Sequence, residues 1–246
     1  MSAPLPTKRD EAWRYSDLAA AESAWPLPAA ESIVVAANQN FNRHIINVAD
    51  VEDVVVRTLD ITLEAGSRGR VQLLNAGGRL GRFVLNVTLH EHSDFYFHAV
   101  QIGSGSQTLE IVTHIRHIEP DAMSHQTVRT IVAGKATGTY LGKVAVAKDA
   151  QRTDSLQSVK AMLLDRTATA NAKPELEIYA DDVKCAHGCA IGELDAMGLF
   201  YLESRGLAPA EAKKLMLQAF VAGVFEGASE EEALTVAALK KLGELV

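Results

Sequence analysis

The chain has 246 residues, 48% hydrophobic and 22% charged, with 24 lysines and arginines against 31 aspartates and glutamates. A chain of this length can bury a substantial hydrophobic core. The presence of only two cysteines excludes a disulfide scaffold and is typical of a reducing compartment. The net charge of −7 argues against a nucleic-acid partner. No apolar run reaches the roughly 18 residues of a membrane-spanning helix, and the first six residues lack the pattern of a signal peptide. We therefore expect a cytoplasmic protein of one or two domains with no membrane partner.

Residues 1–30 differ in composition from the rest of the chain, because they hold four of the seven prolines and both tryptophans. The spacing of apolar residues predicts a helix from Lys8 to Ala21. The Trp-Pro-Leu-Pro stretch that follows is expected to be extended, since proline restricts both itself and the residue before it. We assign residues 1–30 to an N-terminal segment of helical and extended structure.

Residues 31–191 consist of short runs rich in Val, Ile, Leu and Thr, separated by Gly, Asn, Asp and Ser. Several runs alternate between apolar and polar residues, which is the period of a β-strand. The predicted strands are Ser32–Ala37, Val54–Leu63, Arg70–Leu74, Arg82–Leu89, Phe95–Ile102, Thr108–Ile115, Thr127–Val132 and Thr139–Val146. No helix of 12 or more residues interrupts the region, so we expect an all-β core.

A loose repeat distinguishes between the possible β folds. Short acidic or small-polar breaks occur at residues 64–67, 91–94, 119–122 and 148–151. Their first residues, 64, 91, 119 and 148, are 27, 28 and 29 positions apart. A nearly constant period of this size predicts a coiled β-architecture in which each repeat adds a pair of strands to a stack.

Residues 192–246 are predicted to form a helical domain. The three expected helices are Glu193–Arg205, Pro209–Phe225 and a third one that reaches Leu242. Gly206 is a plausible C-cap for the first helix and Gly227 ends the second. Ser229-x-x-Glu232 reads as a capping box that starts the third. The broad apolar stripe of the second helix suits packing onto the β core and also the binding of a partner.

Both cysteines lie in the segment from Lys173 to Cys189, with a histidine between them. If this segment is a strand, Cys185, His187 and Cys189 share one face, about 7 Å from one to the next. Lys184 and the imidazole would lower the pKa of a neighbouring thiol, which would make Cys185 a nucleophile or a ligand for a soft metal.

A plainer interpretation is that these small residues close a strand before a turn at Gly188. Three ligands do not complete a structural zinc site, so a metal or cluster would need a further ligand from elsewhere in the fold or from a partner. We expect the remaining histidines to be ordinary surface or core residues: His44, His90, His92, His98, His114, His117 and His125. No Walker motif and no Ser/His/Asp ordering is present.

The same segment carries a resemblance to a known family. Lys-Pro-Glu-Leu-Glu-Ile-Tyr-Ala-Asp-Asp-Val-Lys-Cys-Ala-His-Gly at residues 173–188 resembles the SufB/SufD family of the Suf iron–sulfur cluster assembly machinery, and SufD more than SufB. Further matching motifs extend the resemblance over nearly the whole chain. They lie at residues 11–18, 124–126, 140–144, 150–154, 191–195, 199–206 and 210–220.

The resemblance implies a fold and a set of partners. It implies a right-handed parallel β-helix core between helical ends. It also implies a SufB-like subunit that pairs with the end of the β-helix, and a SufC-like ATPase that docks on the C-terminal helices. The residues that match the docking region are Leu199, Phe200, Tyr201, Arg205 and Phe220.

The resemblance also suggests a role for the cysteine–histidine segment. Cys185 and His187 match family positions at the SufB–SufD interface, where together with a SufB cysteine they are proposed to hold iron or the nascent cluster transiently. No cofactor is then expected to bind tightly to the isolated chain. Cys189 lies outside the family signature, so we expect it to be a small buried residue rather than a ligand. The N-terminal region is shorter than in many SufD proteins.

The leading hypothesis is therefore a non-catalytic, SufD-type scaffold subunit of a SufBCD complex. One alternative is a homodimeric scaffold that works without SufB and brings two copies of the 185–189 face together by two-fold symmetry. Another alternative is a thiol hydrolase or transferase that uses Cys185 with His187.

Overall fold

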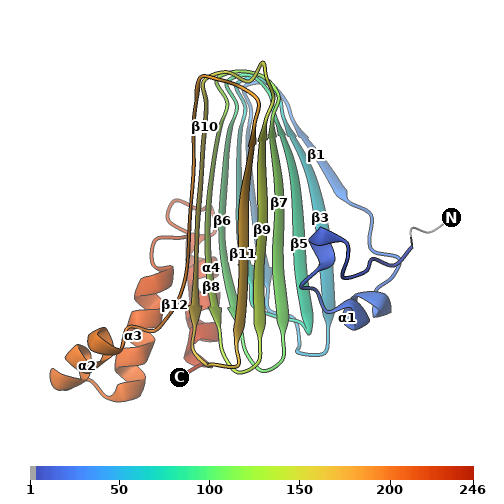
Figure 1. Ribbon diagram of the computed structural model, residues 1–246. Coiled ribbons are helices and arrows are strands. Elements are labelled where there is room, and N and C mark those ends of the chain that lie inside the picture. Colours follow the sequence, from blue (N-terminus) through green and yellow to red (C-terminus); the bar gives the residue numbers. More distant parts are fainter. Residues whose placement is uncertain (1–3) are drawn as a thin grey trace.

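The computed structural model describes residues 4–246 and is built around two six-stranded sheets that face each other (Figure 1). The first, which we call the odd sheet, has the order β1-β3-β5-β7-β9-β11. The second, the even sheet, has the order β2-β4-β6-β8-β10-β12, and all neighbouring strands are parallel. Each coil of the chain adds one strand to each sheet. The protein is a parallel β-solenoid, and the mainly β prediction is confirmed.

The strands have similar lengths, apart from the shorter first coil. The odd sheet contains β1 (Glu31–Val35), β3 (Val54–Leu63), β5 (Leu80–Leu89), β7 (Thr108–His117), β9 (Thr137–Val146) and β11 (Thr169–Ile178). The even sheet contains β2 (Asn40–Asn47), β4 (Arg68–Asn75), β6 (Asp94–Gly103), β8 (Met123–Val132), β10 (Thr153–Leu163) and β12 (Val183–Glu193).

The sequence repeat corresponds to the turns at one end of the solenoid. Each of the four predicted breaks connects an odd strand to the following even strand. All four turns contain a residue with positive φ: Gly66, His92, Asp121 and Arg152 have φ angles of 68°, 56°, 61° and 59°. Glycine takes this conformation without steric cost, and Asp and His tolerate it better than most other residues. The predicted stacking of coils is confirmed.

The core lies between the two sheets, where residues at the same register position stack from coil to coil. Ile61, Val87, Ile115 and Val144 form one such column on the odd sheet and are all buried. Aliphatic side chains of this size fill most of the space between the sheets, together with a few aromatic rings such as Phe83 and Phe97.

Strands β2, β10, β11 and β12 are not among the strands predicted from the hydrophobic pattern. In β2 and β10 the reason is that the inward positions include polar residues. Asn47 on β2 is buried and donates from Nδ2 to Asn75 Oδ1 over 2.9 Å. Asn75 in turn donates to Gln101 Oε1 (3.4 Å), and Gln101 Nε2 donates to Thr130 Oγ1 (3.1 Å). Hydrogen bonds between successive coils thus satisfy this row of polar side chains inside the solenoid.

The predicted helix from Lys8 to Ala21 is wrong. The chain forms a 3-10 turn at Glu11–Trp13 and a separate helix α1 at Leu18–Ser23. Helix α1 starts afresh because the Asp17 carboxylate accepts a hydrogen bond from the Ala20 N–H over 3.0 Å.

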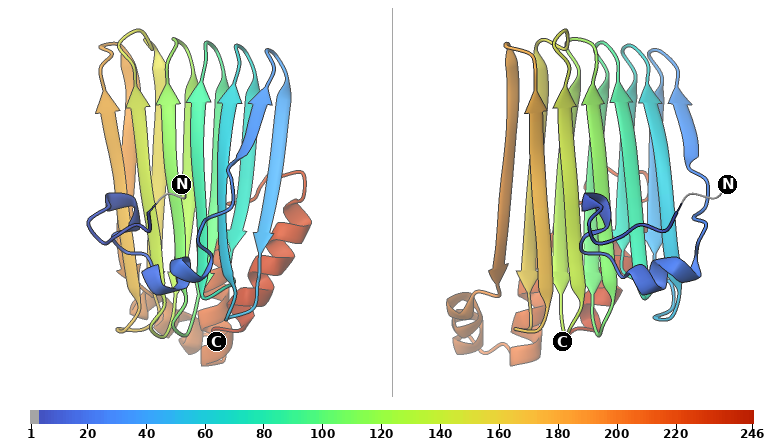
Figure 2. Two further views of the ribbon diagram at one scale, coloured as in Figure 1. Left: turned by 90° about the vertical axis from the view of Figure 1, so that its right-hand side faces the viewer. Right: turned by 45° about the vertical axis from the view of Figure 1, so that its right-hand side comes forward.

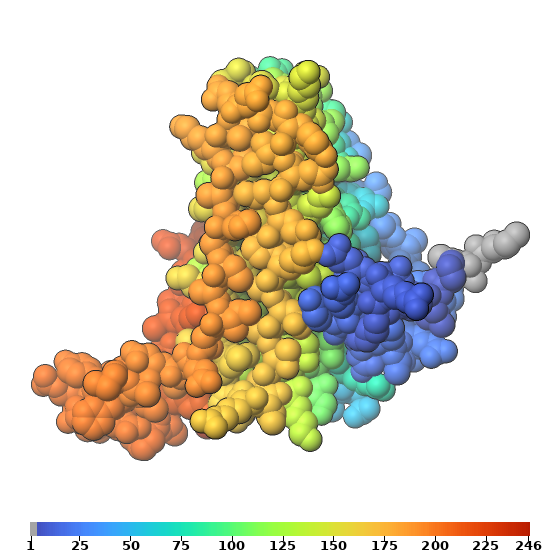
Figure 3. All heavy atoms as spheres, in the orientation of Figure 1, coloured from blue at the N-terminus to red at the C-terminus, as the bar shows by residue number. Residues whose placement is uncertain are grey.

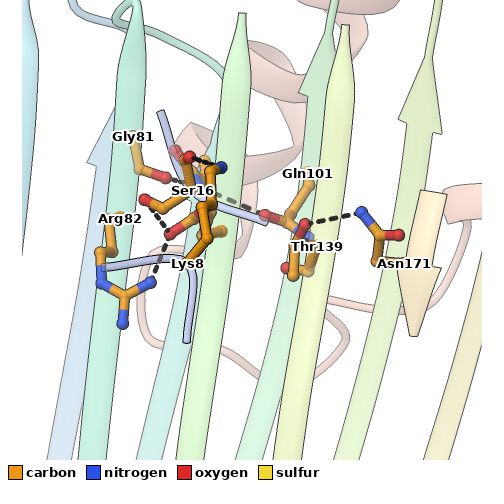
Figure 4. Close-up of polar contacts among 9 residues, drawn as sticks. Lys8, Ser16, Gly81, Arg82, Gln101, Thr139 and Asn171 are labelled. Atoms are coloured by element: carbon orange, nitrogen blue, oxygen red, sulfur yellow. Dashed lines mark hydrogen bonds and ion pairs between the residues drawn. The ribbon is translucent and has the colours of Figure 1, made fainter. Parts of the chain in front are cut away.

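The N-terminal segment, residues 4–30, covers part of the outer face of the odd sheet (Figure 2). Ser16 Oγ donates to the buried Glu110 carboxylate over 3.1 Å, and Arg82 pairs with the same group (Figure 4). The indole ring of Trp13 lies 3.9 Å from the Arg82 guanidinium carbon. A buried ion pair is thereby enclosed between the segment and the sheet.

The C-terminal helices are α2 (Ala196–Ser204), α3 (Pro209–Val221) and α4 (Glu231–Gly243). Helix α4 lies along the outer face of the even sheet, and α3 joins it in an apolar cluster on that sheet, with α2 projecting beyond the sheets (Figures 1 and 2). No helix within residues 4–246 has both the length and the apolar character that crossing a membrane requires.

Three predicted helix boundaries are wrong. The first helix begins at Ala196 instead of Glu193, because Glu193 is the last residue of β12. Helix α3 ends at Val221 instead of Phe225, because the chain turns at Gly223, whose φ is 75°. The capping box at Ser229 does not form: the N-cap of α4 is Glu230, without a side-chain cap hydrogen bond. The carboxylate of Glu231 instead accepts from the Gly227 N–H over 2.8 Å.

Candidate functional site

Strand β12 is the last strand of the even sheet and carries the predicted site residues. It pairs only with β10, and β11 pairs only with β9, so the outer edges of the β11–β12 coil are unpaired within residues 4–246. In Figure 3 neither the N-terminal segment nor the C-terminal helices cover the front face formed by this coil. The solenoid therefore ends in an open coil, which we call the open end.

Cys185, His187 and Cys189 all point to the inner side of β12. Their register partners on β10 are Ser155, Gln157 and Val159, which face the core and are at most 2% exposed. The expected shared face is confirmed. The plainer interpretation of a turn at Gly188 is wrong, because β12 continues to Glu193.

The three side chains are less buried than their partners because no further coil covers them. Cys185 is half-buried against the core, and His187 and Cys189 are exposed. The expectation that Cys189 is a small buried residue is therefore wrong. Two thiols and one imidazole face the space beyond the last coil.

The electrostatic environment of Cys185 differs from the expected one. Burial and the nearby Asp154 carboxylate raise the pKa of its thiol, and a hydrogen bond with the Ser155 backbone opposes them only in part. Lys184, expected to lower this pKa, lies on the opposite face of the strand. Burial also raises the pKa of Cys189. Both thiols are free, and a metal ion that binds either one has to displace its proton.

The inner face of the even sheet becomes polar toward the open end. One column of register partners runs from Gly69 and Phe95 to Ser124, Ser155 and Cys185. The adjacent column runs from Val71 and Phe97 to Gln126, Gln157 and His187. Each predicted site residue thus has two buried polar side chains behind it in the stack.

The first column is connected by hydroxyl hydrogen bonds. Ser155 Oγ lies 3.0 Å from Ser124 Oγ, which lies 2.8 Å from His117 Nε2. His117 is fully enclosed, and burial lowers the pKa of its imidazole to about 4, so the ring is neutral at physiological pH. These interactions hold the two serines beneath Cys185.

The second column forms a network with the opposite sheet. The Tyr140 hydroxyl donates to Gln126 Oε1 (3.0 Å) and accepts from Gln157 Nε2 (3.1 Å), and Thr113 Oγ1 also donates to Gln126 (2.7 Å). Burial raises the pKa of Tyr140 to about 12. Gly142 lies against this hydroxyl, at a position where any Cβ would clash with it. The network was missed in the sequence, although Gln126, Gln157 and His187 recur 31 and 30 residues apart.

The predicted docking residues divide into two groups. Phe200 and Tyr201 on α2 are 64% and 57% exposed, next to Met197 at 73%, and Arg205 lies over the Tyr201 ring at 5.3 Å. Phe220 on α3 instead packs against the apolar cluster between the helices and the even sheet. Leu199 is half-buried. Helix α2 has no buried residue and presents an apolar patch to solvent, which we define as Met197, Phe200 and Tyr201.

A second group of potential metal ligands lies away from the open end. Glu91, His92 and Asp121 have ligand atoms within 4.8 Å of one another at the solenoid turns. The Asp121 carboxylate is already paired with Arg152, which lowers the pKa of this carboxyl group. We assign no site to these surface residues.

The chain is similar to known proteins over most of its length. The family model described as "SUF system FeS cluster assembly, SufBD core domain" matches residues 17–220. An iron–sulfur cluster assembly SufBD family protein of Synechocystis sp. is 35% identical over 185 residues, covering 74% of this chain and 41% of that protein. The iron–sulfur cluster assembly protein SufD of Escherichia coli is 32% identical over 169 residues, covering 68% and 40%. The chloroplastic protein ABCI7 of Arabidopsis thaliana is 31% identical over 209 residues, covering 82% and 43%.

The chain thus spans about two-fifths of the length of each of these relatives. The match to the family model includes every strand of the solenoid and two of the C-terminal helices, α2 and nearly all of α3. The resemblance seen in the cysteine–histidine segment is confirmed: the chain belongs to the SufBD core family of the Suf system.

Proposed function

We propose that this chain is a non-catalytic, SufD-type scaffold subunit for iron–sulfur cluster assembly. In this role it pairs with a SufB-like subunit through the open end of the solenoid and docks a SufC-like ATPase through its C-terminal helices. Membership of the SufBD family and the similarity to proteins named SufD support the assembly role. The observation that carries the proposal is the position of Cys185 and His187 on the uncovered inner face of the last coil.

The free strand edges at the open end suit a partner that extends the solenoid. An unpaired strand presents a row of N–H and C=O groups that another chain can pair with. Tyr179 and Ile191 add apolar surface there, being 63% and 46% exposed. A SufB-like partner that adds strands to β11 and β12 would bury these side chains and cover Cys185 and His187.

Iron or the nascent cluster is the cargo of the proposed site. One thiolate and one imidazole are suitable ligands for iron, but they are two ligands where a tetrahedral site needs four. Same-face residues two positions apart on a strand are about 7 Å apart, so the two side chains have to lean together to share an ion. A partner that supplies a cysteine at the interface provides the missing ligand, and the cargo leaves when the interface opens.

The apolar patch of Met197, Phe200 and Tyr201 is proposed to contact the SufC-like ATPase. Helix α2 projects from the solenoid (Figure 1). Its aromatic side chains Phe200 and Tyr201 are exposed. An exposed aromatic helix face of this kind is typical of a docking helix.

The raised pKa of Cys185 argues against the thiol enzyme, because a catalytic cysteine needs a lowered pKa to form its thiolate. The homodimeric alternative uses the same open end, since a second copy could also cover the free edges. The SufD-type subunit and the homodimeric scaffold would therefore use the same surface, the open end, and differ only in the partner that binds to it.

A co-expression experiment tests the proposal. The chain is produced with the SufB-like and SufC-like proteins of the same organism, and the complex is analysed by native mass spectrometry and by its iron and sulfide content. We expect a stoichiometric complex, and we expect Cys185→Ala and His187→Ala to keep the complex but lose most of its iron. Cys189→Ala is the matched control on the same face and should retain iron. The proposal would be overturned if the chain formed a stable homodimer that does not bind the SufB-like protein. It would also be overturned if Cys185→Ala and His187→Ala both left the iron content of the complex unchanged.

A further inference from the structure

The side chain of Gln157 lies directly behind His187 in the stack and has an unused hydrogen-bond acceptor. Gln157 and His187 are register partners on β10 and β12, both on the inner side of the even sheet. Gln157 is 0% exposed, and its Oε1 has no hydrogen-bond partner. A buried carbonyl oxygen without a donor is uncommon in folded proteins and unfavourable where it persists.

The orientation of the Gln157 amide is fixed by the residues beneath it. The single hydroxyl proton of Tyr140 is donated to Gln126 Oε1 over 3.0 Å, so the Tyr140 oxygen is left as an acceptor. Gln157 Nε2 donates a hydrogen bond to the Tyr140 hydroxyl oxygen over 3.1 Å. The amide nitrogen is thus held toward the core network, and Oε1 is available to a donor from another direction.

Gln126 Nε2, in the same column on the other side of Gln157, also has no hydrogen-bond partner and therefore does not pair with Gln157 Oε1. On the side of the open end, His187 is the residue placed to supply that donor. Of the three inward-facing residues around this position on β12, it alone shares the register of Gln157 and carries an N–H group. Neighbouring strands are about 4.8 Å apart, which is within the reach of an imidazole ring on the same face. In the uncovered coil the ring is exposed. Once a partner covers β12, the ring is enclosed and its N–H needs an acceptor.

We propose that Gln157 is a positioning residue for His187. Its Oε1 accepts the N–H of one ring nitrogen, which selects one tautomer and leaves the lone pair of the other nitrogen free to bind iron. Metal-binding histidines generally have such an acceptor behind them, and its loss typically lowers metal affinity 10- to 100-fold. The inference rests on the proposed function, because it takes His187 as an iron ligand.

The neighbouring coil provides a matched control. Gln126 lies in the same column and the same network, is equally buried, and is one coil farther from His187. Replacing Gln126 or Gln157 by Met keeps the approximate volume and removes the amide in each case. Only the change at Gln157 removes an acceptor next to His187.

The test measures anaerobic binding of Fe(II) to the complex with the SufB-like and SufC-like proteins. We expect Gln157→Met to weaken Fe(II) binding 10- to 100-fold, Gln126→Met to weaken it less than threefold, and Gln157→Glu, which keeps an acceptor oxygen, to bind within threefold of wild type. The double variant Gln157→Met/His187→Ala should bind no more weakly than His187→Ala alone. Thermal unfolding of each complex shows whether it is folded.

The outcomes separate this inference from the proposed function. If His187→Ala leaves Fe(II) binding unchanged, the proposed iron site is wrong. If His187→Ala weakens binding but Gln157→Met does not, or if Gln126→Met weakens it equally, the positioning role alone is wrong. If the Gln157→Met variant does not fold, the Gln157→Glu variant serves as the test, because it keeps an acceptor oxygen. A more than tenfold loss of Fe(II) affinity in Gln157→Glu then overturns the positioning role.

Discussion

The guanidinium of Arg82 and the carboxylate of Glu110 form an ion pair on the outer face of the odd sheet, where the N-terminal segment covers it. Their side chains are only 3% and 1% exposed. Burial raises the pKa of Glu110, and the adjacent Arg82 opposes this effect. The two residues are register partners on β5 and β7, on the outer side of the sheet. Without residues 4–30 this pair would face solvent, so its burial depends on the docking of that segment.

The first prediction concerns the stability of this contact. Arg82→Met leaves the Glu110 carboxylate buried without a positive partner, so we expect the free energy of unfolding to fall by about 3–5 kcal/mol. Urea unfolding measures the loss, and limited proteolysis should show earlier cleavage within residues 4–30. Adding Glu110→Leu should recover much of the loss, because it removes the uncompensated charge.

An exposed ion pair of the same segment is the control. Arg79 Nε lies 3.0 Å from Asp17 Oδ2, but the Arg79 side chain is 48% exposed. Arg79→Met should cost only about 0–1 kcal/mol, because solvent screens an exposed pair. An equal loss of unfolding free energy for Arg79→Met and Arg82→Met would show that burial of the Arg82–Glu110 pair does not increase its contribution to stability.

The second prediction is a pH dependence caused by His117. The folded pKa is about 4 and the ordinary value is 6.5, so between these values the unfolded chain binds more protons than the folded one. The stabilisation is complete above about pH 6.5 and is lost as the pH falls toward 4, with a total of about 3 kcal/mol. Urea unfolding between pH 4.5 and 7 measures it. His117→Gln should reduce the slope of this part of the profile, leaving the contribution of His98 and His114, whose pKa values burial also lowers. The exposed His92→Gln should leave the slope unchanged.

Much of the solenoid could be predicted from the sequence. Strands with apolar inward residues, such as β3 and β5, show the period of two, and the turn repeat gives the coil length. Strand β10 could not be found in this way, because its inward positions include Ser155 and Gln157. Their hydrogen-bond partners, Ser124 and Tyr140, lie on other strands. A pattern within one strand does not contain that information.

The site was predicted in part for the same reason. The shared face of Cys185 and His187 follows from strand alternation, but their environment depends on which residues lie behind them. Lys184 is adjacent in sequence but does not contribute to the shifted pKa of Cys185, whereas Asp154 on the neighbouring strand β10, 31 positions earlier, raises that pKa. The residue behind His187 is Gln157, 30 positions earlier, and the register of the coils is needed to place it there.

The third prediction concerns the apolar patch on α2. Phe200→Ala with Tyr201→Ala removes two exposed aromatic rings, so stability should change by less than about 1 kcal/mol. We expect affinity for the SufC-like ATPase to fall at least tenfold, since exposed aromatic residues commonly dominate such interfaces. Isothermal titration calorimetry measures the affinity. Val236→Ala, at a 60% exposed position on α4, is the control and should bind normally. Unchanged binding in the double variant would remove α2 from the interface.

The last prediction tests the open end itself. Ile191 lies on the inner side of β12 and is 46% exposed, so Ile191→Lys can keep its charge in water while the coil is uncovered. A partner that extends the solenoid would have to bury this charge, and we expect at least a tenfold loss of affinity for the SufB-like subunit with no change in thermal stability. Val34→Lys on β1, 67% exposed at the other end of the stack, is the control. Analytical ultracentrifugation distinguishes the rival scaffold, because in a homodimer Ile191→Lys would yield monomers without any SufB-like protein. Equal effects of the two lysines on SufB binding would show that the partner does not recognise the β12 end.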